Sequence, residues 1–138
     1  MRAQVTTAAL FGLVLTIAVA AGAHLLSSGT AAMSLRSSWD SAMLYGFVHV
    51  LAALVLSGLP LGSRTKAIGG WLFLAGVLLF SLAILARTAL RLTAETADAD
   101  PLKAIGMLAP VGGISFMAGW LTLAIGAVTH KPSVVIGS

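Results

Sequence analysis

The chain has 138 residues, of which 59% are hydrophobic and only 9% are charged, with a net charge of +4. Soluble domains carry about 25% charged and roughly 45–50% apolar residues, so we expect one all-α transmembrane domain over residues 1–138, without a second, soluble domain. The absence of cysteine excludes disulfides, iron–sulfur clusters and thiolate metal sites, and the scattered basic residues favour contact with anionic lipids over nucleic-acid binding.

The first apolar run covers residues 5–26. Its start resembles a secretory signal, because Arg2 precedes the apolar stretch and Ala18-Val-Ala20 resembles a cleavage site. The run nevertheless continues for about 22 residues, and about 20 suffice to cross a bilayer. We therefore expect a retained transmembrane helix rather than a cleaved signal peptide.

The second apolar run covers residues 41–61 and follows a small, polar segment, residues 27–38, that is expected to form a loop. Trp39 is placed as a residue of the aromatic belt at the membrane surface would be. Asp40 is a candidate N-cap for this second helix, whose end is marked by Gly58-Leu-Pro60.

The third apolar run covers residues 68–86, after a short basic turn at residues 63–66. A turn of this length makes the second and third helices antiparallel neighbours. Arg87 and Arg91 lie just beyond the run and can prolong the helix by extending their charged ends to the membrane surface.

The fourth apolar run covers residues 105–128, and Asp100-Pro101 before it has the pattern of an N-cap followed by a first-turn proline. Pro110 lies inside the run, with Gly112 and Gly113 directly after it. Proline lacks the backbone N–H that a helix interior needs, so we expect a kink or break there.

Four transmembrane helices with short connections place both termini on the same side of the membrane. Lysine and arginine are tied at four on each side, so their count does not decide the orientation. The compact Arg64-Thr-Lys66 turn and the lack of acidic residues on the terminal side favour cytoplasmic termini.

One sequence frame, Gly-Gly-x-x-Phe-x-Ala-Gly-x-Leu, occurs twice, in the third and fourth runs. Its residues are Gly69, Gly70, Phe73, Ala75, Gly76 and Leu78 in the first copy, and Gly112, Gly113, Phe116, Ala118, Gly119 and Leu121 in the second. Small residues seven apart lie on one helix face and allow a second helix to approach closely. We therefore expect these six glycines to mediate helix packing, in preference to forming an inverted transporter repeat.

His24, Tyr45 and His49 are the polar candidates within the spans. Tyr45 and His49 lie four apart on one helix face, so the hydroxyl and the imidazole can share a hydrogen bond or a bound polar group such as a quinone headgroup. The alternative is that both hold neighbouring helices together. His24 and His49 differ in depth by about 10 Å at 1.5 Å per residue, which argues against a haem between them.

Arg87 and Arg91 lie one turn apart and are candidates to bind a lipid phosphate or an acidic partner subunit. The spans contain no nucleophile paired with a base, no phosphate loop and no paired carboxylates. We therefore expect no enzymatic activity, no metal site and no cofactor.

Four motifs occur in order between about residues 10 and 128. They are Ala21-Gly-Ala-His24, Trp39-x-x-Ala42-x-x-Tyr45-x-x-x-His49, Gly70-Trp-Leu-Phe…Leu79-Phe-Ser81 and Ala109-Pro-Val-Gly-Gly113…Ala118-Gly-Trp120. Together they resemble the domain-of-unknown-function 423 family, small YgdD- and YwdK-like four-helix proteins of the bacterial inner membrane that are related to transmembrane protein 256. The chain departs from the family at Ala109, where threonine is frequent, and at Leu82-Ala83, where the family has Gly-Ser. The resemblance implies the fold and the location but no activity.

From these observations we expect an accessory or scaffolding subunit of a larger respiratory or photosynthetic membrane complex, in contact with lipids and other membrane-protein subunits. The alternatives are a small carrier or channel, and a quinone- or lipid-binding module, each using His24, Tyr45 and His49.

Overall fold

The computed structural model describes residues 1–26, 30–93 and 104–129, so the N-cap predicted at Asp100 lies outside it. The elements of this described part are all helical: α1 (Arg2–Leu25), α2 (Thr30–Gly58), α3 (Ser63–Gly76), the π-helix η1 (Val77–Leu82), α4 (Ala83–Thr93) and α6 (Leu108–Thr129). Four stretches are long and apolar enough to cross a membrane: Arg2–Leu25, Leu35–Gly58, Ser63–Arg91 and Ala104–Thr129. The predicted all-α bundle of four transmembrane helices is thereby confirmed.

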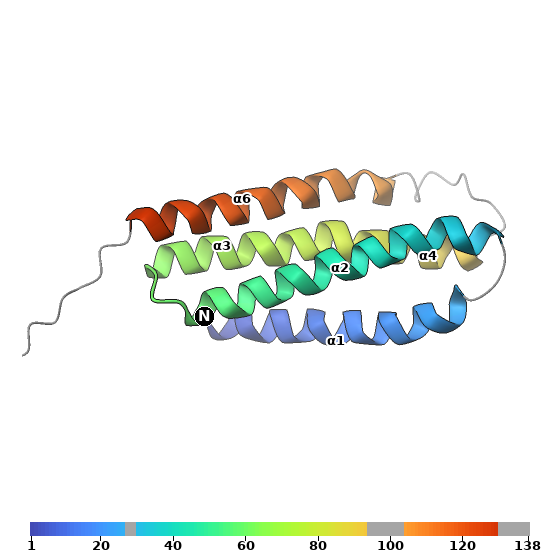
Figure 1. The fold of residues 1–138 in the computed structure, drawn as a ribbon, viewed down its shortest axis with the longest axis horizontal. Coiled ribbons are helices and arrows are strands. Elements are labelled where there is room, and N and C mark those ends of the chain that lie inside the picture. Colours follow the sequence, from blue (N-terminus) through green and yellow to red (C-terminus); the bar gives the residue numbers. More distant parts are fainter. Residues whose placement is uncertain (27–29, 94–103, 130–138) are drawn as a thin grey trace, which may run out of the picture.

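The helices run alternately up and down along one long axis (Figure 1). The α3–η1–α4 helix is central, because α2 packs along its length and α6 covers it on the side away from α1. The N-terminus and the end of α6 lie at one end of the bundle, and the end of α4 and the start of α6 lie at the other. We call these the terminal end and the loop end.

The second helix begins earlier than predicted, and the loop expected at residues 27–38 is wrong beyond residue 29. α2 starts at Thr30, and Asp40 lies inside it instead of capping it, with its carboxylate 3.8 Å from Arg36 one turn earlier. Hydropathy detects only the part of a helix that lies in hydrocarbon, whereas these polar turns continue the helix beyond it. Trp39 lies near the start of the second span, and its side chain is buried and packs on Gly22 of α1.

The third helix is longer than its apolar run at both ends. The basic turn expected at residues 63–66 is wrong, because these residues form the first turn of α3 and only residues 59–62 connect it to α2. At the other end the helix continues through Arg87 and Arg91 to Thr93, as their snorkelling predicted.

The predicted break near Pro110 is present, but it lies at Met107. A short helical turn at residues 104–106 ends there, with the Met107 N–H bonded to the Ala104 carbonyl at 3.2 Å, and α6 starts at Leu108. Pro110 has no N–H to bond to the Gly106 carbonyl, and its ring would collide with that carbonyl in a regular helix. The chain therefore breaks within the turn before the proline.

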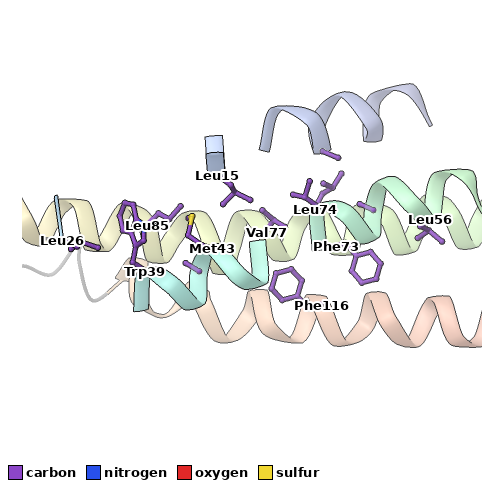
Figure 2. Close-up of a cluster of buried hydrophobic side chains, with 14 residues drawn as sticks. Leu15, Leu26, Trp39, Met43, Leu56, Phe73, Leu74, Val77, Leu85 and Phe116 are labelled. Atoms are coloured by element: carbon purple, nitrogen blue, oxygen red, sulfur yellow. The ribbon is translucent and has the colours of Figure 1, made fainter. Parts of the chain in front are cut away.

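The buried core follows the central helix from end to end (Figure 2). Leu56 lies towards the terminal end, Phe73, Leu74 and Phe116 lie nearer the middle, and Trp39 and Leu85 lie towards the loop end.

Candidate functional site

The two copies of the duplicated frame pack against each other across α3 and α6. A Cβ at Gly76 would strike the ring of Phe116, and a Cβ at Gly119 would lie 2.6 Å from the ring of Phe73. Each phenylalanine thus occupies the space above the other copy's glycine. Where η1 passes α6, a Cβ at Gly112 would lie 2.5 Å from the backbone nitrogen of Phe80, so there the two backbones touch.

Two other glycines of the frame are covered from different helices. A Cβ at Gly69 would lie 3.0 Å from Leu56 of α2, and a Cβ at Gly70 would lie 2.8 Å from Gln4 of α1. The Gln4 amide donates a 2.7 Å hydrogen bond to the Ala67 carbonyl and is buried. Sequence reasoning missed Gln4, although a polar amide in the first turns of an apolar helix was a usable signal.

Gly113 differs from the other five glycines. A Cβ there would meet no atom of the described chain within 4 Å. It faces a groove of about 640 Å³ between α2 and α6, which we call the α2/α6 groove. Its lining is Leu44, Tyr45, Val48, His49, Phe80, Pro110, Gly113, Phe116, Met117 and Trp120.

His49 lies at the base of this groove with both ring nitrogens engaged. The Trp120 indole N–H donates to Nε2 at 3.1 Å, so Nε2 is the acceptor and Nδ1 carries the proton. Nδ1 in turn donates to the Tyr45 backbone carbonyl at 2.8 Å. The imidazole also stacks on Phe116, with ring centroids 3.6 Å apart. The neutral imidazole therefore joins α2 to α6.

Tyr45 contributes its ring and not a hydroxyl bond to His49. The two rings are parallel with centroids 6.2 Å apart, and the bond between the residues uses the Tyr45 backbone. The Tyr45 ring meets Phe80 edge-on, and 47% of the residue is exposed in the groove. A bound molecule in the groove would therefore meet the tyrosine before the histidine.

His24 lies far from this cluster. Gly22 faces Trp39, and Gly12 faces Val50, which fixes how α1 and α2 lie alongside each other. His49 is thus level with Gly12, and His24 is about 18 Å farther along α1 at roughly 1.5 Å per residue. The structure brings Tyr45 and His49 together and leaves His24 at the loop end.

Arg87 and Arg91 also lie at the loop end, on α4. Arg87 is partly buried, whereas Arg91 is exposed. In the described ranges, no three metal-ligating side chains gather in one place.

The π-helix η1 was not predicted, and it holds the buried hydroxyl of Ser81. The wider π turn shifts the backbone by one residue, and the Ser81 Oγ has no hydrogen-bond partner among the described residues. It packs against Gly46 of α2, where an added Cβ would lie 3.1 Å from the Ser81 Oγ. The sequence carries no signal for this change of helix type.

Residues 18–113 match the sequence profile of the family described as "Protein of unknown function (DUF423)". The UPF0382 inner membrane protein YgdD of Escherichia coli K12 is 34% identical over 94% of this chain and 92% of its own length. A UPF0382 membrane protein of Staphylococcus saprophyticus is 36% identical over 76% of this chain and 79% of its own, and YwdK of Bacillus subtilis is 30% identical over 67% and 69%. No solved structure matches the chain.

Proposed function

The chain belongs to the DUF423 family and is a multi-pass protein of the bacterial inner membrane, and from this premise we propose that it is an accessory or scaffolding subunit of a larger membrane complex. A respiratory or photosynthetic complex is the expected setting. In this proposal the α2/α6 groove receives a transmembrane helix of the partner.

The observation that carries the proposal is the open position of Gly113. A glycine inside a helix costs about 1 kcal/mol relative to alanine. The other five glycines of the frame offset this cost by admitting a side chain or a backbone of the same chain. Gly113 admits nothing from the described chain, and it lies in an apolar groove where a second helix can approach its backbone.

The use of His49 also favours a scaffold over a carrier. A carrier needs polar groups that can exchange protons or ligands during transport. Both nitrogens of His49 are instead bonded within the chain, and His24 lies far away along α1. This arrangement of His49 supports a role in helix packing.

The test is purification of the tagged protein from native membranes in mild detergent, followed by mass spectrometry. We expect stoichiometric partners with the wild type and with Ala124→Leu, which adds bulk at an exposed site on α6. Gly113→Leu fills the groove, so we expect partner recovery to fall roughly tenfold or more, since each 1.4 kcal/mol of lost binding is a factor of ten. As an isolated chain, free of partners, the variant should give the same size-exclusion profile as the isolated wild-type chain.

A wild-type protein that purifies without partners, or a Gly113→Leu variant that keeps them, would contradict the proposal. Gly76→Leu provides the opposite control. Its side chain would collide with Phe116 inside the chain, so this variant should lose the fold itself.

A second candidate is a quinone- or lipid-binding module in the same groove. The groove volume of about 640 Å³ suits a small molecule, and the rings of Tyr45, Phe116 and Trp120 line it. The Tyr45 hydroxyl would bond the headgroup, because His49 is already engaged. Quinone in an organic extract of the purified wild type, lost in Tyr45→Phe while any partners remain, would favour this candidate.

A further inference from the structure

Another cavity, of about 180 Å³, is lined by residues of the loop end and shares no lining residue with the α2/α6 groove. It is formed by the first part of α2, by α4 and by the turn that precedes α6. Its polar lining consists of Ser38, Arg87, Thr88 and Arg91. No acidic side chain is among the described residues that line it. Two positively charged side chains, Arg87 and Arg91, therefore line one small space.

Arg87 is held in place at the wall of this cavity. A Cβ at Gly106 would lie 3.2 Å from the central carbon of the Arg87 guanidinium, so the guanidinium packs closely on the glycine backbone. The Arg87 Nε is buried and lacks a hydrogen-bond partner among the described residues. Arginine stays charged in proteins, and a buried donor without an acceptor is costly. The position is thus suited to an anionic acceptor.

The depth and the remaining lining indicate the source of that acceptor. The third membrane span ends at Arg91, and the fourth begins at Ala104, which places the cavity at the level of the lipid headgroups. Leu35, Ile84 and Ile105 supply aliphatic surface beside the arginines. A soluble anion needs no such surface, whereas a phospholipid presents a phosphate and an acyl chain together.

We propose that this cavity binds the phosphate group of an anionic phospholipid. Arg87, held over Gly106, donates from its guanidinium group to a phosphate oxygen, and the exposed Arg91 supplies a second charge from one turn farther along α4. The acyl chain lies along Leu35, Ile84 and Ile105. We call this the phosphate cavity, and it is independent of any partner in the α2/α6 groove.

The test is native mass spectrometry of the delipidated full chain in detergent, titrated with phosphatidylglycerol. Diacylglycerol with the same acyl chains is the matched ligand without phosphate. We expect one bound phosphatidylglycerol with the wild type, and binding that is weaker by roughly tenfold or more in Arg87→Gln, the loss expected for a hydrogen bond to a charged group. Arg36→Gln is the matched control, because Arg36 is exposed on α2 near the same end and pairs with Asp40. It should bind as the wild type does.

Because Arg87 is partly buried, its loss can also weaken the fold. Arg91→Gln removes the second charge at an exposed position, where the fold does not depend on it, and should also weaken phosphatidylglycerol binding. Equal phosphatidylglycerol affinity in the wild type, Arg87→Gln and Arg91→Gln would overturn the proposal, as would equal binding of diacylglycerol. A competition arm with inorganic phosphate distinguishes the sources. If phosphate alone binds and phosphatidylglycerol does not, the lipid source is wrong.

Discussion

At the scale of single residues, His49 shows how a buried polar side chain can be fully satisfied inside a membrane protein. Only 4% of the residue is exposed, and its two nitrogens connect the Tyr45 carbonyl of α2 to the Trp120 indole of α6. Trp120 itself is 46% exposed, so its ring covers the histidine from the membrane side while its N–H points inwards. An ionisable residue within a span is here a means of joining helices.

We predict a favourable coupling between His49 and Trp120 in a double-mutant cycle of His49→Phe and Trp120→Phe. Interhelical hydrogen bonds in membranes contribute about 0.6 kcal/mol on average and up to about 1.7 kcal/mol, so a coupling of about 0.5–1.5 kcal/mol is expected. Reversible unfolding in mixed detergent micelles measures it. The exposed Trp71→Phe is the control and should change stability little. Additive effects at His49 and Trp120 would show that the bond contributes nothing.

At the scale of elements, the duplicated frame works because α3 and α6 are antiparallel. In such a pair, two helices that carry the same motif are related by a two-fold axis. Each contact from the first helix to the second is therefore matched by an equivalent contact from the second to the first. Phe73 lies over Gly119, and Phe116 lies over Gly76. The repeat therefore produces two equivalent knob-and-hole contacts from one sequence pattern, and the buried imidazole of His49 stacks against one of the two rings.

Alanine substitutions should separate the glycines of the frame by their surroundings. Gly119→Ala places a methyl group 2.6 Å from the Phe73 ring, so we expect a loss of about 1–3 kcal/mol in unfolding free energy. Gly113→Ala meets open space in the described chain, so it should be neutral or stabilising by up to about 1 kcal/mol through helix propensity. Thermal unfolding in detergent measures both. Equal losses of unfolding free energy in Gly119→Ala and Gly113→Ala would contradict the assignment of Gly119 to a packed face and of Gly113 to an open one.

At the scale of the whole molecule, the third span is the structural centre and α1 is peripheral. In their most apolar windows, half of the residues of Ser63–Arg91 are buried, compared with 17% for Arg2–Leu25. Gln4 compensates in part, because its amide bonds the Ala67 carbonyl and holds the start of α1 against α3. The first and fourth spans consequently offer most of their surface to lipid or to a partner.

The arrangement predicts that both chain ends lie on one face of the membrane, and the compact basic segment at Arg64 and Lys66 favours the cytoplasm. Alkaline phosphatase fused after Thr129 should therefore be inactive. The same enzyme inserted between residues 94 and 103 should be active, because it would lie on the other face. The reverse pair of activities would show the opposite orientation, and two equal activities would contradict a membrane span at Ala104–Thr129.

The sequence by itself determined the spans, the break before Pro110 and the family. Each membrane helix satisfies its own backbone hydrogen bonds, so the length and apolarity of a segment suffice to identify it. Where polar turns extended a helix beyond the hydrocarbon, as in α2 before Asp40, hydropathy carried no information and the predicted boundary was wrong.

Only the tertiary structure decided which faces meet. That choice depends on the rotation of each helix about its axis and on how far it is shifted along its neighbour, and both follow from the packing of all helices together. In the packed bundle, Trp39 lies on Gly22, Gly119 faces Phe73, and Gly113 contacts no side chain of the described residues. The packing also brought Trp120 to His49, and set Arg87 against Gly106 at the wall of the phosphate cavity. None of these pairs is close in sequence, so no local pattern could reveal them.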